Sequence, residues 1–122
     1  MASLMVLSDL HSREAMLVGL RQQGVTVVGT RDTEEGVGFC VQGAPSAILV
    51  DMPALGQECF RSIAQLRLAA PGTPIFALGE WNNALISHYA ERAGATRYLK
   101  TPVAIDKLHA LITAPHEAKY LN

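Results

Sequence analysis

The sequence predicts an α/β fold in which five parallel strands are covered by helices on both faces. Short apolar runs of strand length alternate five times with segments whose apolar residues recur at helical spacing. The middle run, Ala47–Asp51, has no polar alternation, which is typical of a strand buried on both faces. The loops between segments are short and favour right-handed crossovers, so the expected architecture is one doubly wound parallel sheet.

Five apolar runs are expected to form the strands. They cover residues 3–8, 25–28, 47–51, 74–78 and 95–99. The second run, Val25–Val28, consists only of β-branched residues, which favour strands. The third ends on a carboxylate, Asp51, where the chain leaves the apolar run.

Helices are expected after each of these strands. They cover about residues 12–23, 32–42, 60–70, 82–93 and 104–113. Gly24 and Gly94 are C-terminal stops, Asp32 or Thr33 caps the second helix, and Asn82 or Asn83 caps the fourth. Two glycines inside that second helix each weaken it by about 1 kcal/mol relative to alanine.

Length and composition indicate one globular domain. The chain has 122 residues, of which 49% are hydrophobic and only 17% are charged, so it can bury a core. The net charge is -1 and Lys and Arg form no cluster, which argues against direct nucleic-acid binding. Neither a membrane-spanning run nor a signal peptide is recognisable, so we expect a cytoplasmic protein without membrane contact.

Residues 1–114 are expected to form the domain and residues 115–122 a tail or linker. Cys40 and Cys59 lie on apolar helix faces and are expected to be reduced core thiols.

Asp51 is the first candidate for chemistry. In open α/β sheets, ligands bind in the crevice at the carboxyl ends of the strands, and Asp51 ends the central strand. The alternative is a helix cap, because Asp51-Met52-Pro53 leads into a new segment and Asp favours such positions. The other strand ends offer Ser8-Asp9, Gly29-Thr30, Gly79-Glu80 and Lys100-Thr101-Pro102. No strand-to-helix turn is rich enough in glycine to cradle a nucleotide or flavin phosphate.

Two stretches carry a family resemblance. One is Ala93 to Pro102, with its alanine-glycine-alanine start, its aromatic Tyr98 and its terminal Lys-Thr-Pro; the other is the strand that ends at Asp51. On these residues the chain resembles the receiver domain of bacterial two-component response regulators, over nearly its full length. The resemblance implies the CheY-like, flavodoxin-like (βα)5 fold with strand order 2-1-3-4-5, and a place in a phosphorelay.

The resemblance also implies roles for individual residues. Asp51 matches the aspartate that accepts a phosphoryl group from a histidine kinase. Ser8 and Asp9 match the two acids that hold Mg²⁺ together with that aspartate, and Pro53 matches the residue whose backbone carbonyl completes the set. Because one acid is replaced by serine, weak Mg²⁺ binding is the most that we expect. Mg²⁺ needs only one or two carboxylates and keeps several waters.

Two further positions depart from the family pattern. Gly79 stands where a hydroxyl residue normally bonds the phosphoryl group, and Thr101 stands where a lysine normally pairs with it. Lys100 lies one residue earlier, and strand alternation points it away from the crevice. Since phosphoryl transfer depends on cations and donors around the transferred group, these losses predict weakened or absent phosphorylation of Asp51.

The resemblance implies that Tyr98 is the switch aromatic. It also implies that the loop of Gly79, Glu80 and Trp81 is the segment that normally moves on phosphorylation. A static, packed Tyr98 is the alternative. An exposed Trp81 suggests a partner contact, since Trp is enriched in binding hot spots; the alternative is an indole lying on its own domain.

We therefore expect an atypical receiver, or pseudo-receiver, that acts through protein contacts rather than as an enzyme. Its partner or second copy is expected to bind the fourth helix, fifth strand and fifth helix. The alternative is a conventional phosphoacceptor that uses Asp9, Asp51 and Mg²⁺, catalyses at most its own phosphorylation and dephosphorylation, and has a histidine kinase as partner.

Overall fold

The computed structural model describes residues 2–9, 11 and 13–114, and it confirms the predicted fold. One sheet of five parallel strands has the order β2-β1-β3-β4-β5. The strands are β1 (Ser3–Leu7), β2 (Thr26–Thr30), β3 (Ala47–Asp51), β4 (Ile75–Gly79) and β5 (Arg97–Lys100). The predicted tail, residues 115–122, lies outside the described residues.

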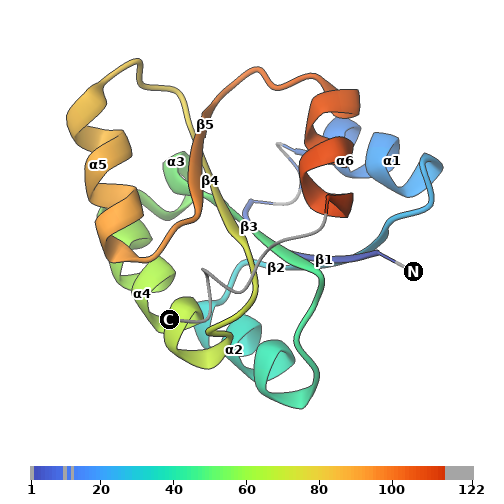
Figure 1. Cartoon of the computed structure of the whole chain (residues 1–122), viewed down its shortest axis with the longest axis horizontal. Helices are drawn as coiled ribbons and strands as arrows, with labels where there is room; N and C mark the ends of the chain where they lie inside the picture. The colour runs from blue at the N-terminus through green and yellow to red at the C-terminus, as the bar shows by residue number, and fades with distance from the viewer. Residues whose placement is uncertain (1, 10, 12, 115–122) are drawn as a thin grey trace.

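Helices cover both faces of the sheet (Figure 1). The helices are α1 (Glu14–Gln22), α2 (Thr33–Gln42), α3 (Met52–Leu55), α4 (Cys59–Ala69), α5 (Ala84–Ala93) and α6 (Ile105–Thr113), with a 3₁₀ turn at Gly56–Glu58. Helices α1 and α6 pack on one face, and α2, α4 and α5 pack on the other. Among the described residues, no helix is long and apolar enough to span a membrane.

Strand β3 is the centre of the core, as its sequence predicts. Residues Ala47 to Val50 are fully buried, and their side chains alternate between the two faces. Ile48 and Val50 join the core under α2, α4 and α5, whereas Leu49 joins the core under α1 and α6. By the same alternation Asp51 belongs to the α1 side of the sheet.

Three predicted element boundaries were wrong. The expected strand 95–99 is shifted to Arg97–Lys100, because pairing with β4 begins at Arg97. The expected strand 25–28 is shifted to Thr26–Thr30, because Gly29 and Thr30 pair with Val6 and Leu7 of β1. The segment expected as a loop after β3 forms the short helix α3, whose first turn contains Pro53. Proline suits that position because its fixed φ is helical and no helical hydrogen bond is lost there.

Other local predictions are confirmed. The Asp32 side chain caps α2 by accepting a hydrogen bond from the Glu34 amide at 3.0 Å, and Asn83 caps α5 through the Leu85 amide at 2.8 Å. Cys40 and Cys59 are free and buried, and burial raises the pKa of both thiols. Both are therefore unreactive core side chains.

Candidate functional site at the end of strand β3

Asp51 is buried at the carboxyl end of β3, and both of its carboxylate oxygens accept hydrogen bonds. The residue is only 1% exposed. Ser8 Oγ donates to Asp51 Oδ2 at 2.7 Å. Arg13 donates from Nε to Oδ2 at 2.8 Å and from Nη2 to Oδ1 at 3.1 Å, which is a bidentate guanidinium–carboxylate pair.

The fold brings these three residues together from distant parts of the sequence. Strands β1 and β3 are parallel neighbours with Leu7 opposite Val50, so Ser8 follows beside Asp51. Ser8 is held there by its amide, which donates to the Thr30 carbonyl at 3.0 Å. Arg13 lies directly before α1, on the side of the sheet to which alternation assigns Asp51.

The Arg13 guanidinium is the counter-ion of Asp51. Its hydrogen bond to Asp51 is the largest influence that raises the pKa of Arg13; partial burial opposes the rise, and the charges of Asp51 and Glu80 add to it. The cation therefore persists at any pH at which the domain is folded. In the part of the chain that the structure describes, no buried side-chain nitrogen or oxygen lacks a hydrogen-bond partner.

The interpretation of Asp51 as a helix cap is wrong. Asp51 does precede α3 in the N-cap position, but its side chain makes no capping hydrogen bond. The carboxylate is used by Ser8 and Arg13 instead.

An open crevice of about 400 Å³ lies over this carboxylate. The described residues that line it are Asp9, Arg13, Asp51, Pro53, Ala54 and Glu80. The crevice thus brings together the three residues expected to hold Mg²⁺, and carboxylate and carbonyl oxygens are its preferred ligands. Weak Mg²⁺ binding is compatible with this donor set, but the ion must compete with Arg13 for Asp51. Asp9 is also engaged, since its Oδ1 accepts from Arg31 Nη2 at 3.1 Å and from the His11 amide at 3.3 Å.

Lys100 and Thr101 lie away from this crevice. Lys100, on the edge strand β5, is exposed and is not among the described residues that line the crevice. Thr101 donates from its amide and its hydroxyl to the Gly79 carbonyl, at 2.8 Å and 3.3 Å. Thr101 therefore fastens the end of β4 to the end of β5.

Tyr98 lies against Gly79 and is bonded to the backbone of Trp81. The Tyr98 hydroxyl donates to the Trp81 carbonyl at 2.8 Å and accepts from the Trp81 amide at 3.1 Å. Burial raises the pKa of Tyr98, so the phenol stays protonated and able to donate. The Trp81 residue is 43% exposed, and Glu80 beside it is exposed as well.

Sequence reasoning missed Arg13, which interacts with Asp51 more extensively than any of the predicted residues. It was assigned only to the start of a helix. One signal was available: a basic residue follows β1 in the loop at the carboxyl edge, where this chain lacks one of the two acids of the family pattern. The sequence does not show that Arg13 and Asp51, which are 38 residues apart, form a bidentate contact.

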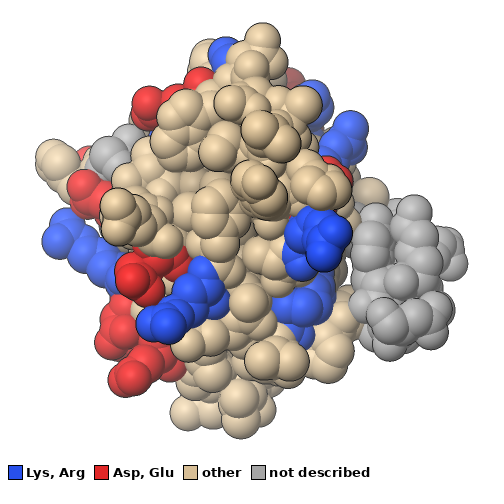
Figure 2. All heavy atoms as spheres, turned by 90° about the vertical axis from the view of Figure 1, so that its left-hand side faces the viewer, with Lys and Arg blue, Asp and Glu red and all other residues tan. Residues whose placement is uncertain are grey.

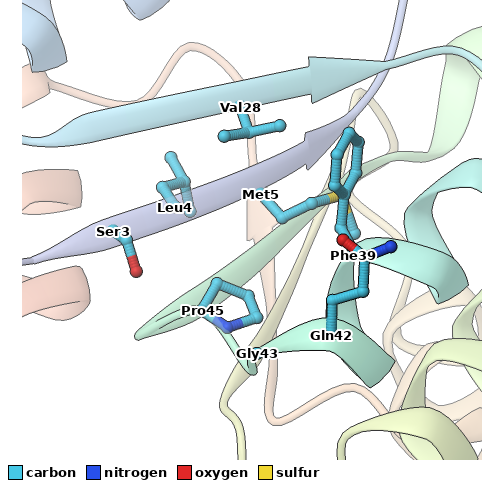
Figure 3. Close-up of a pocket in the computed structure, with 8 residues that line it drawn as sticks. All are labelled: Ser3, Leu4, Met5, Val28, Phe39, Gln42, Gly43 and Pro45. Carbon is cyan, nitrogen blue, oxygen red and sulfur yellow. The ribbon is translucent and has the colours of Figure 1, made fainter.

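A second cavity, of about 320 Å³, lies between β1, β2 and the C-terminal part of α2 (Figure 3). Its described lining is Ser3, Leu4, Met5, Val28, Phe39, Gln42, Gly43 and Pro45. None of these side chains is an acid, a base or a thiol.

Comparison with known proteins supports the receiver fold. No protein-family model matches the sequence, and no curated protein matches it. Solved structures do: a receiver domain of a Pseudomonas aeruginosa sensor histidine kinase, with magnesium in its active-site cleft, has a TM-score of 0.78 at 18% identity, over 98% of this chain and 97% of that one.

Two further solved structures show the same fold. A Burkholderia pseudomallei response regulator with a phosphorylated aspartate has a TM-score of 0.80 at 19% identity, over 93% of this chain and 67% of that one. A Saccharomyces cerevisiae receiver domain, solved with a histidine phosphotransfer protein, has a TM-score of 0.76 at 21% identity, over 93% and 86% of the two chains. The chain has the CheY-like receiver fold of two-component response regulators.

Proposed function

We propose that this chain is an atypical receiver domain that acts through protein contacts, without phosphorylation of Asp51. One observation carries the proposal: Asp51 is buried, and Arg13 and Ser8 occupy both of its carboxylate oxygens. A guanidinium tethered to the chain already neutralises the charge that a bound metal would otherwise balance.

This arrangement opposes phosphoryl transfer for two physical reasons. A carboxylate that attacks phosphorus needs an oxygen with an accessible lone pair, whereas Asp51 is 1% exposed, its Oδ2 accepts two hydrogen bonds and its Oδ1 accepts one from Arg13. The transferred group also needs cations and donors around its oxygens. Gly79 has no side chain to donate, and the Thr101 hydroxyl bonds the Gly79 carbonyl.

A conventional phosphoacceptor is the alternative function. It is favoured by the crevice, which places Asp9, Asp51 and Pro53 together as the family resemblance implies. In this alternative Mg²⁺ displaces Arg13 from Asp51, and a histidine kinase supplies the phosphoryl group.

Incubation with acetyl phosphate and Mg²⁺, followed by intact-mass measurement, distinguishes the two functions. We expect no stoichiometric phosphorylation, because Asp51 is paired with Arg13 rather than with a metal. The matched control is Asp51→Asn, which removes the acceptor and keeps the shape of the side chain. Phosphorylation that requires Mg²⁺ and disappears in Asp51→Asn would contradict the proposal and establish the conventional function.

The surface formed by α5, β5 and α6 is the proposed contact face. Trp81, Leu85 and Tyr89 follow one another at intervals of four residues and are 43%, 59% and 53% exposed. Figure 2 shows the side of the molecule on which α4 and α5 lie, and its centre carries few charged side chains. Exposed apolar surface with charges around it is typical of protein interaction sites. The yeast receiver domain solved with a phosphotransfer protein supports a protein partner for this fold.

Leu85→Glu tests this face. We expect the wild-type chain to form a concentration-dependent dimer in analytical ultracentrifugation, and the variant to weaken it at least about tenfold, because a carboxylate would be buried in an apolar contact. The control is Val41→Glu on α2, a residue that is 70% exposed on a helix outside the proposed face. A dimer that survives Leu85→Glu would place the contact elsewhere, and a wild-type monomer at high concentration would contradict self-association.

A further inference from the structure

We propose that Gly79, Tyr98 and Thr101 form a permanent brace that holds the loop of residues 79–83 and keeps Trp81 exposed. We call these three residues the loop brace. The inference rests on the proposed function, because it names the device that would present the contact face without phosphorylation. Tyr98 and Thr101 each bond a different backbone position of the loop, and Gly79 leaves room for the Tyr98 ring.

Tyr98 fixes the middle of the loop. Its hydroxyl both accepts from the Trp81 amide and donates to the Trp81 carbonyl, so one side chain satisfies both backbone groups of one residue. The pair of bonds defines the orientation of the Trp81 backbone. A backbone fixed in this way reduces the conformational freedom of the exposed indole, so less conformational entropy is lost when a partner binds.

Gly79 makes room for the Tyr98 ring. A Cβ atom at position 79 would lie 2.3 Å from Tyr98 Oη and 2.6 Å from Cε1, far inside contact distance. Any other residue there, including the hydroxyl residue of the family pattern, requires the ring to move. The glycine and the inward tyrosine therefore depend on one another.

Thr101 and Asn83 fix the two ends of the loop. Thr101 donates twice to the Gly79 carbonyl, where β4 ends. Asn83 Oδ1 accepts from the Leu85 amide, where α5 begins. Glu80 belongs to this loop and lines the crevice, but none of these bonds includes its side chain or those of Ser8, Arg13 and Asp51, so we infer that the bonds of the brace hold in either state of the crevice.

Hydrogen exchange of the Trp81 amide tests the brace directly, because Tyr98 Oη is the acceptor of that amide. Tyr98→Phe keeps the ring and removes only the oxygen, so the fold is expected to survive. We expect the exchange of the Trp81 amide, relative to the buried amide of Leu78, to become about tenfold faster. The control Tyr89→Phe removes the same atom from an exposed tyrosine of α5 and is expected to leave the rate unchanged. An unchanged rate in Tyr98→Phe would overturn the inference.

Gly79→Ala provides a second, independent test. The added methyl group displaces the Tyr98 ring, so Trp81 exchange is expected to accelerate by at least as much as in Tyr98→Phe. Gly38→Ala adds the same methyl group within α2, where nothing lies within 4 Å of it, and is expected to leave Trp81 unchanged. Equal Trp81 exchange in Gly79→Ala and wild type would show that the glycine is not required, and would overturn its place in the brace.

The same measurement separates this inference from the proposed function. Asp51→Asn, and beryllofluoride with Mg²⁺ added to the wild type, are both expected to leave the relative exchange of Trp81 unchanged. If acetyl phosphate modifies Asp51 while Trp81 protection stays constant, the proposed function fails and the brace stands. If the exchange rate of the Trp81 amide changes in Asp51→Asn or on addition of beryllofluoride, the brace is not independent of the crevice and that part of the inference is overturned.

Discussion

Replacing Arg13 with glutamine is expected to lower the free energy of unfolding by about 2 to 3 kcal/mol. Removing one partner of a buried ion pair costs about 3 to 5 kcal/mol, because the other charge is left uncompensated. The Asp51 side chain is 2% exposed and the Arg13 side chain 21%, so water at the crevice moderates the loss. Urea unfolding of the two proteins measures the difference.

Arg31→Gln is the matched control for Arg13→Gln. Arg31 also pairs with a carboxylate at the crevice, Asp9, at 3.1 Å, but the two side chains are 71% and 49% exposed. Exposed ion pairs contribute about 0 to 1 kcal/mol, so this variant is expected to be nearly as stable as wild type. Equal losses of unfolding free energy in the two arginine variants would show that the Arg13–Asp51 pair stabilises the fold no more than an exposed ion pair does.

The Arg13→Gln variant is also expected to gain affinity for Mg²⁺. With the guanidinium gone, the ion no longer has to displace a cation from Asp51, and Mg²⁺ should raise the Tm of the variant more than that of the wild type. Adding Asp51→Asn to the variant is expected to restore much of the lost stability, because no charge is then left unpaired. A Tm that responds to Mg²⁺ equally in wild type and variant would contradict the competition between Arg13 and the metal.

Arg67→Met is the other substitution with a large expected effect, about 3 kcal/mol of lost stability. The Arg67 guanidinium is half-buried on α4 and donates to four backbone carbonyls, those of Ala70, Pro71, Thr73 and Gly94, at 2.6 to 3.2 Å. It also donates to Thr96 Oγ1, which in turn accepts from the first amide of β4. Each buried acceptor that loses its donor costs about 1 to 3 kcal/mol.

This arginine is stabilised by dipoles rather than by an acid. Burial lowers the pKa of Arg67, and none of the ion pairs among the described residues includes it. Its contacts join the end of α4 to the residues just before β4 and β5, at the opposite edge of the sheet from Gly79 and Thr101. The control is Arg61→Met on the same helix, whose side chain is 74% exposed and lies 3.8 Å from Glu58. That change is expected to cost less than about 0.5 kcal/mol, and comparable losses at both positions, measured by urea unfolding, would contradict the role of Arg67.

The fold followed from the sequence because each element is specified locally. The apolar run before Asp51, the caps at Asp32 and Asn83 and the stops at Gly24 and Gly94 are all visible within a few residues. The shift of β2 was not visible, since Gly29 continues the strand only because β1 lies beside it.

The central residue of the candidate site was predicted from the sequence, but the interactions of that residue were not. Asp51 was identified from its place at the end of a buried strand, which is a local property. Arg13, Ser8 and Thr101 have roles that depend on which side chain lies across the sheet edge. Thr101 was expected beside the phosphoryl position, and it bonds Gly79 instead. A sequence shows that such residues differ from a family pattern, but only the packed structure shows what they contact.

The buried pairing of Asp51 also affects how experiments in living cells are interpreted. An aspartate at the end of the third strand is the position that a geneticist would replace to block phosphorylation. In this chain such a replacement removes the carboxylate that pairs with the guanidinium of Arg13, the residue directly before α1. The folded fraction falls, and quality-control proteases then reduce the amount of protein in the cell. A mutant phenotype at this position would therefore reflect the lower amount of the protein in the cell before it reflected any loss of signalling.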